Sequence, residues 1–444
     1  MGKEKAAGAR LTDAAGAAGI AEKINNGAYN YYSATVAETS GDGGAAKGLK
    51  RLFAAALLSS TSVMAFGVPA GATPAACVQD GSPSTYTCSG DNGDTSVLIM
   101  GDGLTVTADE TFSIETTGEA FGVGVNAGIR VTGDASTLTN YGSVTTSVTP
   151  SHYTYSRHDA LSVSGMSGTS RVENKDGGYA STTSDTSFAL YAFSGETAET
   201  SNAGTVVTTG DHSDALVSRG GSSALAETPG SLTDSGISAN GLVAVANNGT
   251  ATANNLEGGT VTVNGESAAG IYAQGSVANV TNDGTIYVTD SSSTGIALTG
   301  DTVTGTNNGT IEVSGDYSAA ISGNSYGLAT TNLVNNGTIT VTSEYSTGVV
   351  GVGPTVNITN AEGATISSGA SGIAVIAGGA RSGTISNAGT ITGDVNGGGD
   401  RRVAVKARAT SGMTVENTGT IDGTINFAYA TDTTVNNIGG AVGD

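Results

Sequence analysis

The feature that most constrains the fold of this chain is a short phrase that recurs at nearly constant spacing. It reads Asn-Asp-Gly-Thr-Ile-Tyr-Val from Asn282, Asn-Asn-Gly-Thr-Ile-Glu-Val from Asn307 and Asn-Asn-Gly-Thr-Ile-Thr-Val from Asn335. The three asparagines are separated by 25 and 28 residues. Self-similarity with a fixed period of about 20–50 residues is the sequence signature of repeat architectures such as solenoids.

Each repeat has the local chemistry of short strands joined by a turn. Asn and Gly tolerate positive φ, so the Asn-x-Gly step predicts a tight turn. After the turn the residues alternate, which places Ile286 and Val288 on one face of a strand and Thr285 on the other. A second strand is predicted at 295–298. Because the period contains no helical pattern and is shorter than a propeller blade of about 40–45 residues, it indicates a parallel β-helix with coils about 4.8 Å apart.

The repeated asparagines are predicted to stack as a ladder, in which each side-chain amide donates to its copy in the next coil. At about 27 residues per coil, residues 96–444 predict about twelve coils. The span between residues 206 and 247 is longer than one period, so 227–230 is predicted to be a loop that leaves the stack before the series resumes at Asn247. A last partial copy is expected at Asn436, and Asn174 continues the early series. The predicted turn and ladder residues are Asn140, Asn202, Asn282, Asn307, Asn335, Asn360, Asn387 and Asn417.

The composition limits the classes of function. The chain has 444 residues with 39 acidic and 17 basic side chains, which gives a net charge of −22. Nucleic-acid binding needs clustered Lys and Arg to neutralise phosphates, so a nucleic-acid partner is not expected. Glycine-rich chains with few aromatic residues are often disordered. The fixed register of Val and Ile argues instead for a folded repeat region.

The N-terminal part of the chain divides into three expected segments. Residues 1–46 are small and polar and are expected to form a disordered extension. Residues 47–72 combine a basic start, an apolar run and an Ala-Gly-Ala end, which predicts a secretory signal peptide cleaved after Ala72; a buried helix is the alternative interpretation. Residues 73–95 contain the only two cysteines, Cys77 and Cys88. They predict one disulfide in an oxidising compartment and a cap over the first coil.

Two segments carry residue types that could do chemistry. The most aromatic and charged one contains His152, Tyr153, Tyr155, Arg157 and His158, and is a candidate ligand-contact loop; a solvated loop is the alternative. The Gly-Asn-Ser-Tyr-Gly sequence at 323–327 matches the letters of a nucleophile elbow. That elbow needs a strand, a sharp turn and a helix, which the repeat context does not provide. The match is therefore interpreted as coincidence.

The basic cluster at 400–408 is the remaining candidate. Arg401, Arg402, Lys406 and Arg408 follow Asp400, and Val403 and Val405 alternate with them. This pattern predicts an exposed strand face rather than the base of a lyase. The Gly-Gly-Gly-Asp sequence at 397–400 is a single poor match to calcium-binding nonapeptides, which occur in tandem, and predicts a loop. No catalytic residue, cofactor site or metal site is therefore predicted.

Taken together, the signal peptide, the early cysteine pair and the Asn-x-Gly-Thr-Ile coils of about 75–444 resemble the passenger region of bacterial type V autotransporters, the pertactin-like group. The resemblance implies a right-handed parallel β-helix that acts without enzymatic activity as an adhesin or structural rod at the cell surface. It also implies export through an outer-membrane β-barrel translocator, which is expected to be absent from this chain because the sequence still reads as repeats up to residue 444. Expressed without a barrel, the chain is expected to remain in the periplasm.

The resemblance does not identify the binding partner. A host receptor or a surface polysaccharide is the kind of partner expected. Two other classes of function also remain. A β-helical polysaccharide lyase or hydrolase would bring acids and an arginine together from adjacent coils, and a tail-spike-like or separately secreted exoprotein would behave as a trimer or have its own transporter.

Overall fold

The computed structural model describes residues 77–443, except 83, 118–126, 148–156, 328, 395–402, 410–411 and 428–431. The predicted extension 1–46, the predicted signal peptide 47–72 and residues 73–76 of the predicted cap lie outside the described residues. The described regular structure consists of 39 β-strands. No helix long and apolar enough to cross a membrane occurs in this part of the chain.

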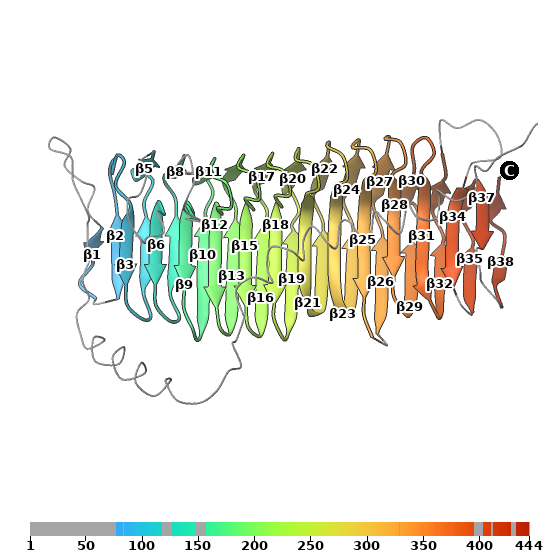
Figure 1. Ribbon diagram of the computed structural model, residues 1–444, viewed down its shortest axis with the longest axis horizontal. Helices are drawn as coiled ribbons and strands as arrows, with labels where there is room; N and C mark the ends of the chain where they lie inside the picture. Colours follow the sequence, from blue (N-terminus) through green and yellow to red (C-terminus); the bar gives the residue numbers. More distant parts are fainter. Residues whose placement is uncertain are drawn as a thin grey trace, which may run out of the picture.

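The strands wind into a rod in which each coil contributes one strand to each of three faces (Figure 1). The first is a 13-stranded sheet. Its strands are β5 (Ser113–Thr116), β8 (Ser143–Thr146), β11 (Tyr179–Thr182), β14 (Thr205–Thr208), β17 (Ser231–Asp234), β20 (Thr260–Val263), β22 (Thr285–Val288), β24 (Thr310–Val313), β27 (Thr338–Val341), β30 (Thr365–Ser367), β33 (Thr390–Thr392), β36 (Thr420–Asp422) and β39 (Ala441–Val442).

The second face, called the asparagine face because most of its strands end in Asn, precedes the 13-stranded sheet in each coil. Its strands are β2 (Thr85–Cys88), β4 (Thr105–Ala108), β7 (Thr137–Asn140), β10 (Thr169–Asn174), β13 (Thr197–Asn202), β16 (Ser223–Thr228), β19 (Thr250–Asn255), the second halves of β21 (Ala269–Asn282) and β23 (Thr294–Asn307), β26 (Thr330–Asn335), β29 (Thr355–Asn360), β32 (Ser382–Asn387), β35 (Met413–Asn417) and β38 (Thr434–Asn437).

Along the chain, each strand of the third face follows a strand of the 13-stranded sheet and precedes the next strand of the asparagine face. Its strands are β3 (Val97–Met100), β6 (Ile129–Thr132), β9 (Leu161–Ser164), β12 (Leu190–Ser194), β15 (Leu216–Gly220), β18 (Leu242–Ala246), the first halves of β21 and β23, β25 (Ala319–Ser325), β28 (Thr347–Val352), β31 (Ile373–Ala380), β34 (Val403–Ala409) and β37 (Thr424–Phe427). Because β21 and β23 run through the corner without a break, the second and third faces form one 26-stranded sheet.

Parallel pairing in register produces the core. In the 13-stranded sheet Ile286 pairs with Ile311 and Ile311 with Ile339, so identical side chains stack along the inside of the rod. All three are buried, with 0% of their surface exposed. The inward residues form one continuous cluster from Cys77 to Ile421. The predicted all-β parallel solenoid is confirmed, and the 13 strands of this sheet are close to the expected number of coils.

Two details of the predicted register are wrong. Residues 227–230 do not leave the stack, because β16 and β17 continue both sheets through this coil. The ladder also does not resume at Asn247, which lies in the exposed turn between β18 and β19, at a different corner of the coil. The residue in register with Asn282 is Asn255. In this coil Thr228 occupies the position of the ladder asparagine. The asparagine pattern therefore skipped the coil, and the interval appeared longer than one period.

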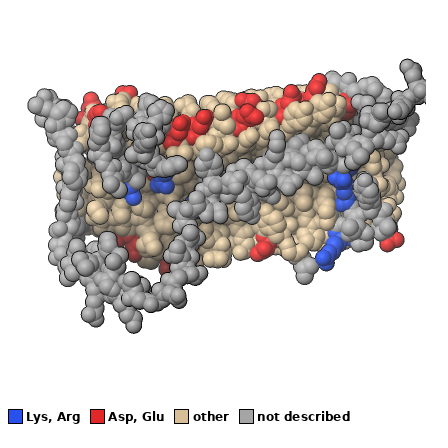
Figure 2. Space-filling model, viewed as in Figure 1, with Lys and Arg blue, Asp and Glu red and all other residues tan. Residues whose placement is uncertain are grey.

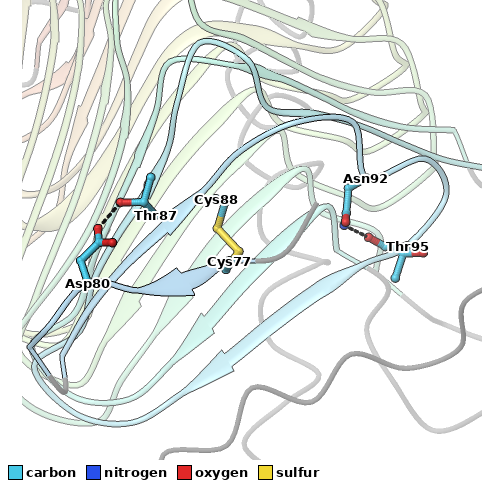
Figure 3. Close-up of a disulfide and its surroundings, with 6 residues drawn as sticks. All are labelled: Cys77, Asp80, Thr87, Cys88, Asn92 and Thr95. Atoms are coloured by element: carbon cyan, nitrogen blue, oxygen red, sulfur yellow. Dashed lines mark hydrogen bonds between the residues drawn. A yellow bond between two sulfur atoms is a disulfide. The ribbon is translucent and has the colours of Figure 1, made fainter. Parts of the chain in front are cut away.

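The N-terminal end of the rod is covered by residues that do not follow the coil pattern. β1 (Val78–Gln79) pairs antiparallel with β2, so it covers the open edge of the asparagine face. Asp91 forms a bridge to Ser113 at the open edge of the 13-stranded sheet. Cys77 and Cys88 are joined by a disulfide beneath these strands, and the Thr87 hydroxyl donates to the Asp80 carboxylate beside it (Figure 3). The open strand edges of a solenoid invite association unless covered, so this arrangement protects two of the three.

Protein prepared under oxidising conditions is expected to contain the Cys77–Cys88 disulfide. Non-reduced peptide mapping by mass spectrometry should find the two peptides linked, and reduction should lower stability by about 2–3 kcal/mol at most because the closed loop is short. Cys88→Ser should have the same effect as reduction. Two free thiols in exported protein would contradict both the bridge and the expected compartment.

Candidate functional surfaces

The predicted asparagines lie at one corner of the rod, where the asparagine face turns into the 13-stranded sheet. Asn282 Nδ2 donates to Asn307 Oδ1 at 2.7 Å, and Asn307 Nδ2 donates to Asn335 Oδ1 at 2.8 Å. The same amide also donates to the carbonyl of its own turn, as Asn307 does to Gly309 O at 3.2 Å. Equivalent bonds of 2.7–2.9 Å link Asn140 to Asn174, Asn174 to Asn202, Asn255 to Asn282, Asn335 to Asn360, Asn360 to Asn387, Asn387 to Asn417 and Asn417 to Asn437.

The reason for Asn-x-Gly differs from the predicted one. None of the described asparagines has positive φ, so the positive-φ explanation is wrong for the asparagines; it holds for the glycines of the longer turns, such as Gly363 with a φ of 79°. The asparagine is required because its side-chain amide makes hydrogen bonds with the polar groups that are buried at this corner. The glycine is there because the turns stack so closely that a Cβ on Gly309 would lie 2.0 Å from Gly284 O in the neighbouring coil. The last ladder member is Asn437 and not Asn436, since Asn437 accepts the amide of Asn417.

Replacing one ladder asparagine is expected to destabilise the rod. Asn307→Ala removes a buried donor and acceptor and leaves Asn335 Oδ1 without the amide that donates to it, so the free energy of unfolding should fall by about 1–3 kcal/mol. Asn308→Ala is the matched control, because Asn308 is the exposed neighbour in the same turn. Chemical denaturation of both variants checks this, and equal stabilities would contradict the structural role of the ladder.

The ladder has one gap, at Thr228. The Thr228 hydroxyl accepts from Asn202 Nδ2 at 3.3 Å and donates to the Asn202 carbonyl at 3.1 Å. It therefore supplies no donor to the next coil, and the buried Asn255 Oδ1 has no hydrogen-bond partner.

Thr228→Asn is expected to close this gap and to stabilise the protein by about 1 kcal/mol, because the new amide can donate to Asn255 Oδ1. Thermal or denaturant unfolding of the variant measures this. Thr228→Val removes the hydroxyl without adding an amide and should destabilise. A stability for Thr228→Asn at or below that of the parent protein would show that this corner cannot accept the amide.

A second ladder, made of serines, was not predicted. It lies at the corner after the 13-stranded sheet, where Ser318 Oγ accepts from Ser293 N at 3.1 Å and Ser346 Oγ accepts from Ser318 N at 3.0 Å. The sequence contains the signal, because these serines are separated by 25 and 28 residues, the same intervals as Asn282, Asn307 and Asn335.

Acidic side chains gather along the upper edge of the rod in Figure 2.

The candidate ligand-contact loop is only partly described. His152, Tyr153 and Tyr155 lie outside the described residues. Arg157 forms an ion pair with the buried Asp159 at 2.7 Å, and its guanidinium carbon lies 3.8 Å from the centre of the Tyr191 ring. His158 is only 2% exposed, and its carbonyl accepts from the Thr146 hydroxyl. The two described residues therefore hold neighbouring coils together.

Acids and an arginine do converge from adjacent coils at one place that the sequence interpretation missed. Arg171 on β10 contacts Glu173 at 3.5 Å and pairs with Glu199 on β13, and Lys175 Nζ lies 2.9 Å from Glu173. Arg171 and Glu199 are in register across the two strands, so aligning the repeats would have revealed the pair. Each of these four charges is paired within the cluster. The arrangement is a partly exposed ion-pair network on the outside of the asparagine face.

The other candidate residues lie on strands. Ser325 is the last residue of β25, without a following helix, and its hydroxyl accepts from Thr331 Oγ1 at 2.9 Å, so the nucleophile-elbow geometry is absent. Lys406 and Arg408 alternate with the buried Val405 and Ala407 on β34 and point outward. Arg401, Arg402 and 397–400 lie outside the described residues. Within the described ranges, no group of three His, Cys, Asp or Glu side chains is placed to hold a metal ion.

One groove interrupts the regular surface at the asparagine corner. Its volume is about 490 Å³, and its residues include Asp176, Tyr179, Gly204, Pro229 and Gly258. The turns at 174–178 and 255–259 are two residues longer than those at 202–204 and 228–230. The longer turns form the two ends of the groove, and the shorter turns form its floor. The groove is thus produced by a change in turn length across successive coils.

These observations define the class of protein as an all-β parallel solenoid with one long core and polar outer corners. The family model of the BigA third pectate lyase-like domain matches residues 58–300, which is more than half of the chain. The chain therefore belongs to this family. Searches of curated proteins and of solved structures gave no match.

Proposed function

We propose that this solenoid is a non-enzymatic adhesin displayed at the cell surface, and that it binds a ligand in the groove between 174–178 and 255–259. The groove carries the proposal, because in this part of the described chain the coils depart from uniform stacking and form a concave surface. In solenoids the core is usually rigid, and the connecting turns make the contacts with the ligand.

The chemistry of the groove suits a carbohydrate. Its residues include Asp176 and Tyr179, together with glycine and proline backbone. A carboxylate and backbone carbonyls accept hydrogen bonds from sugar hydroxyls, and a tyrosine ring offers a flat apolar surface with a polar end. A surface polysaccharide, or the glycan of a host receptor, is therefore the expected partner.

The lyase or hydrolase alternative has less support. Such an enzyme needs an unpaired basic side chain beside acidic groups, and the convergent cluster of Arg171, Glu173, Lys175 and Glu199 is internally paired. Pairing with carboxylates favours the charged form of a basic group and makes it a poorer base. The pectate lyase-like description of the family supports a relationship of fold, and function depends on the site.

Export to the cell surface is part of the same proposal. The disulfide between Cys77 and Cys88 is typical of an oxidising compartment. The autotransporter resemblance adds an outer-membrane translocator as the partner that would carry the rod outside. The excess of 39 acidic over 17 basic residues disfavours a nucleic-acid ligand.

Binding of the purified chain to immobilised polysaccharides and glycans tests the proposed ligand site. Asp176→Ala and Tyr179→Ala are expected to weaken binding at least about tenfold, which corresponds to about 1.4 kcal/mol. Tyr287→Ala is the matched control, because Tyr287 is an exposed tyrosine on the same sheet outside the groove. Unchanged binding in both groove variants would remove the groove from the proposal.

Two further assays test the surface display and the non-enzymatic character of the protein. Labelling of intact cells that naturally produce the chain should reach it, and label that appears only after lysis would contradict surface display. Incubation with polygalacturonate and other acidic polysaccharides should give no unsaturated product. Formation of that product, lost in Arg171→Ala, would favour the lyase alternative.

A further inference from the structure

The corner where the 13-stranded sheet leads into the third face contains one residue per coil in the left-handed region of φ. Eight consecutive coils have such a residue, with φ between 54° and 60°: Thr186, His212, Ser238, Ser267, Ser292, Tyr317, Tyr345 and Ser371. Residues with bulky side chains adopt this conformation only at a cost, whereas Gly and Asn adopt it readily. Two of the eight residues are nevertheless tyrosines.

The two tyrosines stack on each other at the surface of the rod. The centres of their rings are 5.2 Å apart, and the angle between the ring planes is 9°. The residues belong to neighbouring coils, because Tyr317 N donates to Glu344 O at 3.1 Å. Each tyrosine is 48% exposed. The pair therefore packs one ring against the other and still leaves about half of each residue in contact with solvent.

The stack ends after two rings. Ser292 and Ser371 occupy the same position in the coils on either side of the pair. A serine side chain is too short to cover an aromatic ring, so the outer face of each tyrosine has room for another planar group. Coils repeat about every 4.8 Å, which is close to the spacing of the two rings, so a planar group at either end would continue the stack.

A carboxylate accompanies each ring. Asp316 and Glu344 directly precede the two tyrosines, and both are exposed. Asp316 Oδ1 accepts from Glu344 N at 3.0 Å, and neither carboxylate forms an ion pair with a described residue. This corner forms the upper edge of the rod in Figure 1, along which Figure 2 shows the acidic side chains. Negative charge therefore lies beside aromatic faces, which themselves attract cations.

The same combination of groups holds an arginine elsewhere in this protein. The guanidinium carbon of Arg157 lies 3.8 Å from the centre of the Tyr191 ring, and the guanidinium pairs with Asp159 at 2.7 Å. A guanidinium is planar, so it can stack on an aromatic ring and donate two parallel hydrogen bonds to a carboxylate, which the ammonium group of lysine cannot do. Among the described residues, the cation–ring contacts involve Arg157 and not the exposed tyrosine pair.

We propose that the tyrosine pair and its two carboxylates form a binding surface for an arginine-bearing segment of a partner protein. An arginine of the partner stacks on the outer face of Tyr317 or Tyr345 and pairs with the adjacent carboxylate. The net charge of −22 favours the approach of a basic segment. The site lies at the other end of the strands of the 13-stranded sheet from the groove, and it does not depend on the proposed carbohydrate binding.

Binding of a fluorescent peptide of repeated Arg-Gly-Ser units to the full chain tests the proposal, at about 0.15 M salt to screen unspecific attraction to the acidic rod. The double variant Tyr317→Gly, Tyr345→Gly should bind the peptide at least about fivefold more weakly, because it removes both rings without changing the charge. Glycine adopts positive φ readily, so this variant should remain folded. The double variant Ser292→Gly, Ser371→Gly is the matched control at the same position of the coil and should bind like the parent.

The contribution of the carboxylate has a matched control of its own. Asp316→Asn should weaken binding of the peptide at least about twofold. Asp211 occupies the equivalent position in an earlier coil, where its Oδ1 accepts from Ile237 N at 3.0 Å, but His212 and not a tyrosine follows it. Asp211→Asn makes the same change of charge and should leave the affinity unchanged.

Several results would overturn the proposal. Equal affinities of the parent and the double tyrosine variant would show that the rings do not contribute, and an equal loss in the double serine variant would assign the effect to the flexibility of the corner. A peptide of repeated Lys-Gly-Ser units that binds as tightly as the arginine peptide would exclude guanidinium stacking. Asp176→Ala should leave binding of the arginine peptide unchanged, so this site and the carbohydrate groove are tested independently.

Discussion

Ile311→Asp is expected to destabilise the solenoid by about 5 kcal/mol or more. Ile311 is fully buried on β24 and stacks between Ile286 and Ile339 of the neighbouring coils. Removing a large aliphatic side chain from such a site costs about 2–5 kcal/mol, and burying a carboxyl group without a partner adds more. Because each coil contacts only its neighbours, the damage should uncouple the coils before and after 311.

The next position on the same strand supplies the control. Glu312 is a naturally acidic outward residue, so β24 tolerates a carboxylate on that side. Thr310→Asp, also directed outward, should change the free energy of unfolding by less than about 1 kcal/mol. Denaturant unfolding and limited proteolysis distinguish the two variants. A wild-type unfolding midpoint for Ile311→Asp would mean that the inward assignment of this strand is incorrect.

Asp234→Asn is expected to stabilise the protein at mildly alkaline pH and to remove a pH dependence. Asp234 is fully buried at the end of β17, in register with Thr208 and Val263. Burial, and to a smaller extent the nearby Asp214, raises the pKa of Asp234 to about 8, while hydrogen bonds from Gly236 N and Thr208 Oγ1 oppose this. Its Oδ2 has no hydrogen-bond partner. The folded protein therefore holds this carboxyl group largely neutral at pH 7.

The sign of the effect follows from the two protonation states. The pKa of Asp234 is about 8 in the folded protein and about 3.8 in the unfolded chain, so the folded state binds more protons between these values. Stability should fall as the pH rises from about 4 to about 8, with a total loss on the order of 5 kcal/mol at most.

Denaturant unfolding of the two proteins at a series of pH values measures this effect. Asp234→Asn keeps an oxygen acceptor for Gly236 N and cannot ionise, so its stability should exceed that of the parent at pH 8 and approach it near pH 4. Asp234→Val removes the acceptor as well and separates the two contributions. Parallel pH profiles for the parent and for Asp234→Asn would show that Asp234 does not ionise over this range.

The parts of the structure that repeat could be predicted from the sequence. The spacing of Asn282, Asn307 and Asn335, with alternating Ile and Thr after each, established the coils, the inward face and the asparagine corner. Parallel coils in register place each residue beside its own copy, so the local pattern is also the long-range contact pattern. Gly309 was predicted for the wrong reason, because close stacking of the coils and not backbone φ requires it, whereas Gly363 in a longer turn has the predicted positive φ.

The parts that break the repeat depended on the tertiary structure. Thr228 occupies a ladder position without the asparagine that marks it, and the groove arises because turns of different length lie side by side. Asp234 is hydrophilic by type, yet its register with Val263 places it in the core. The sequence alone therefore determined the coil, because a repeated local pattern specifies its own neighbours. Only the tertiary structure decided where the coils differ, because those differences depend on residues that meet from separate turns.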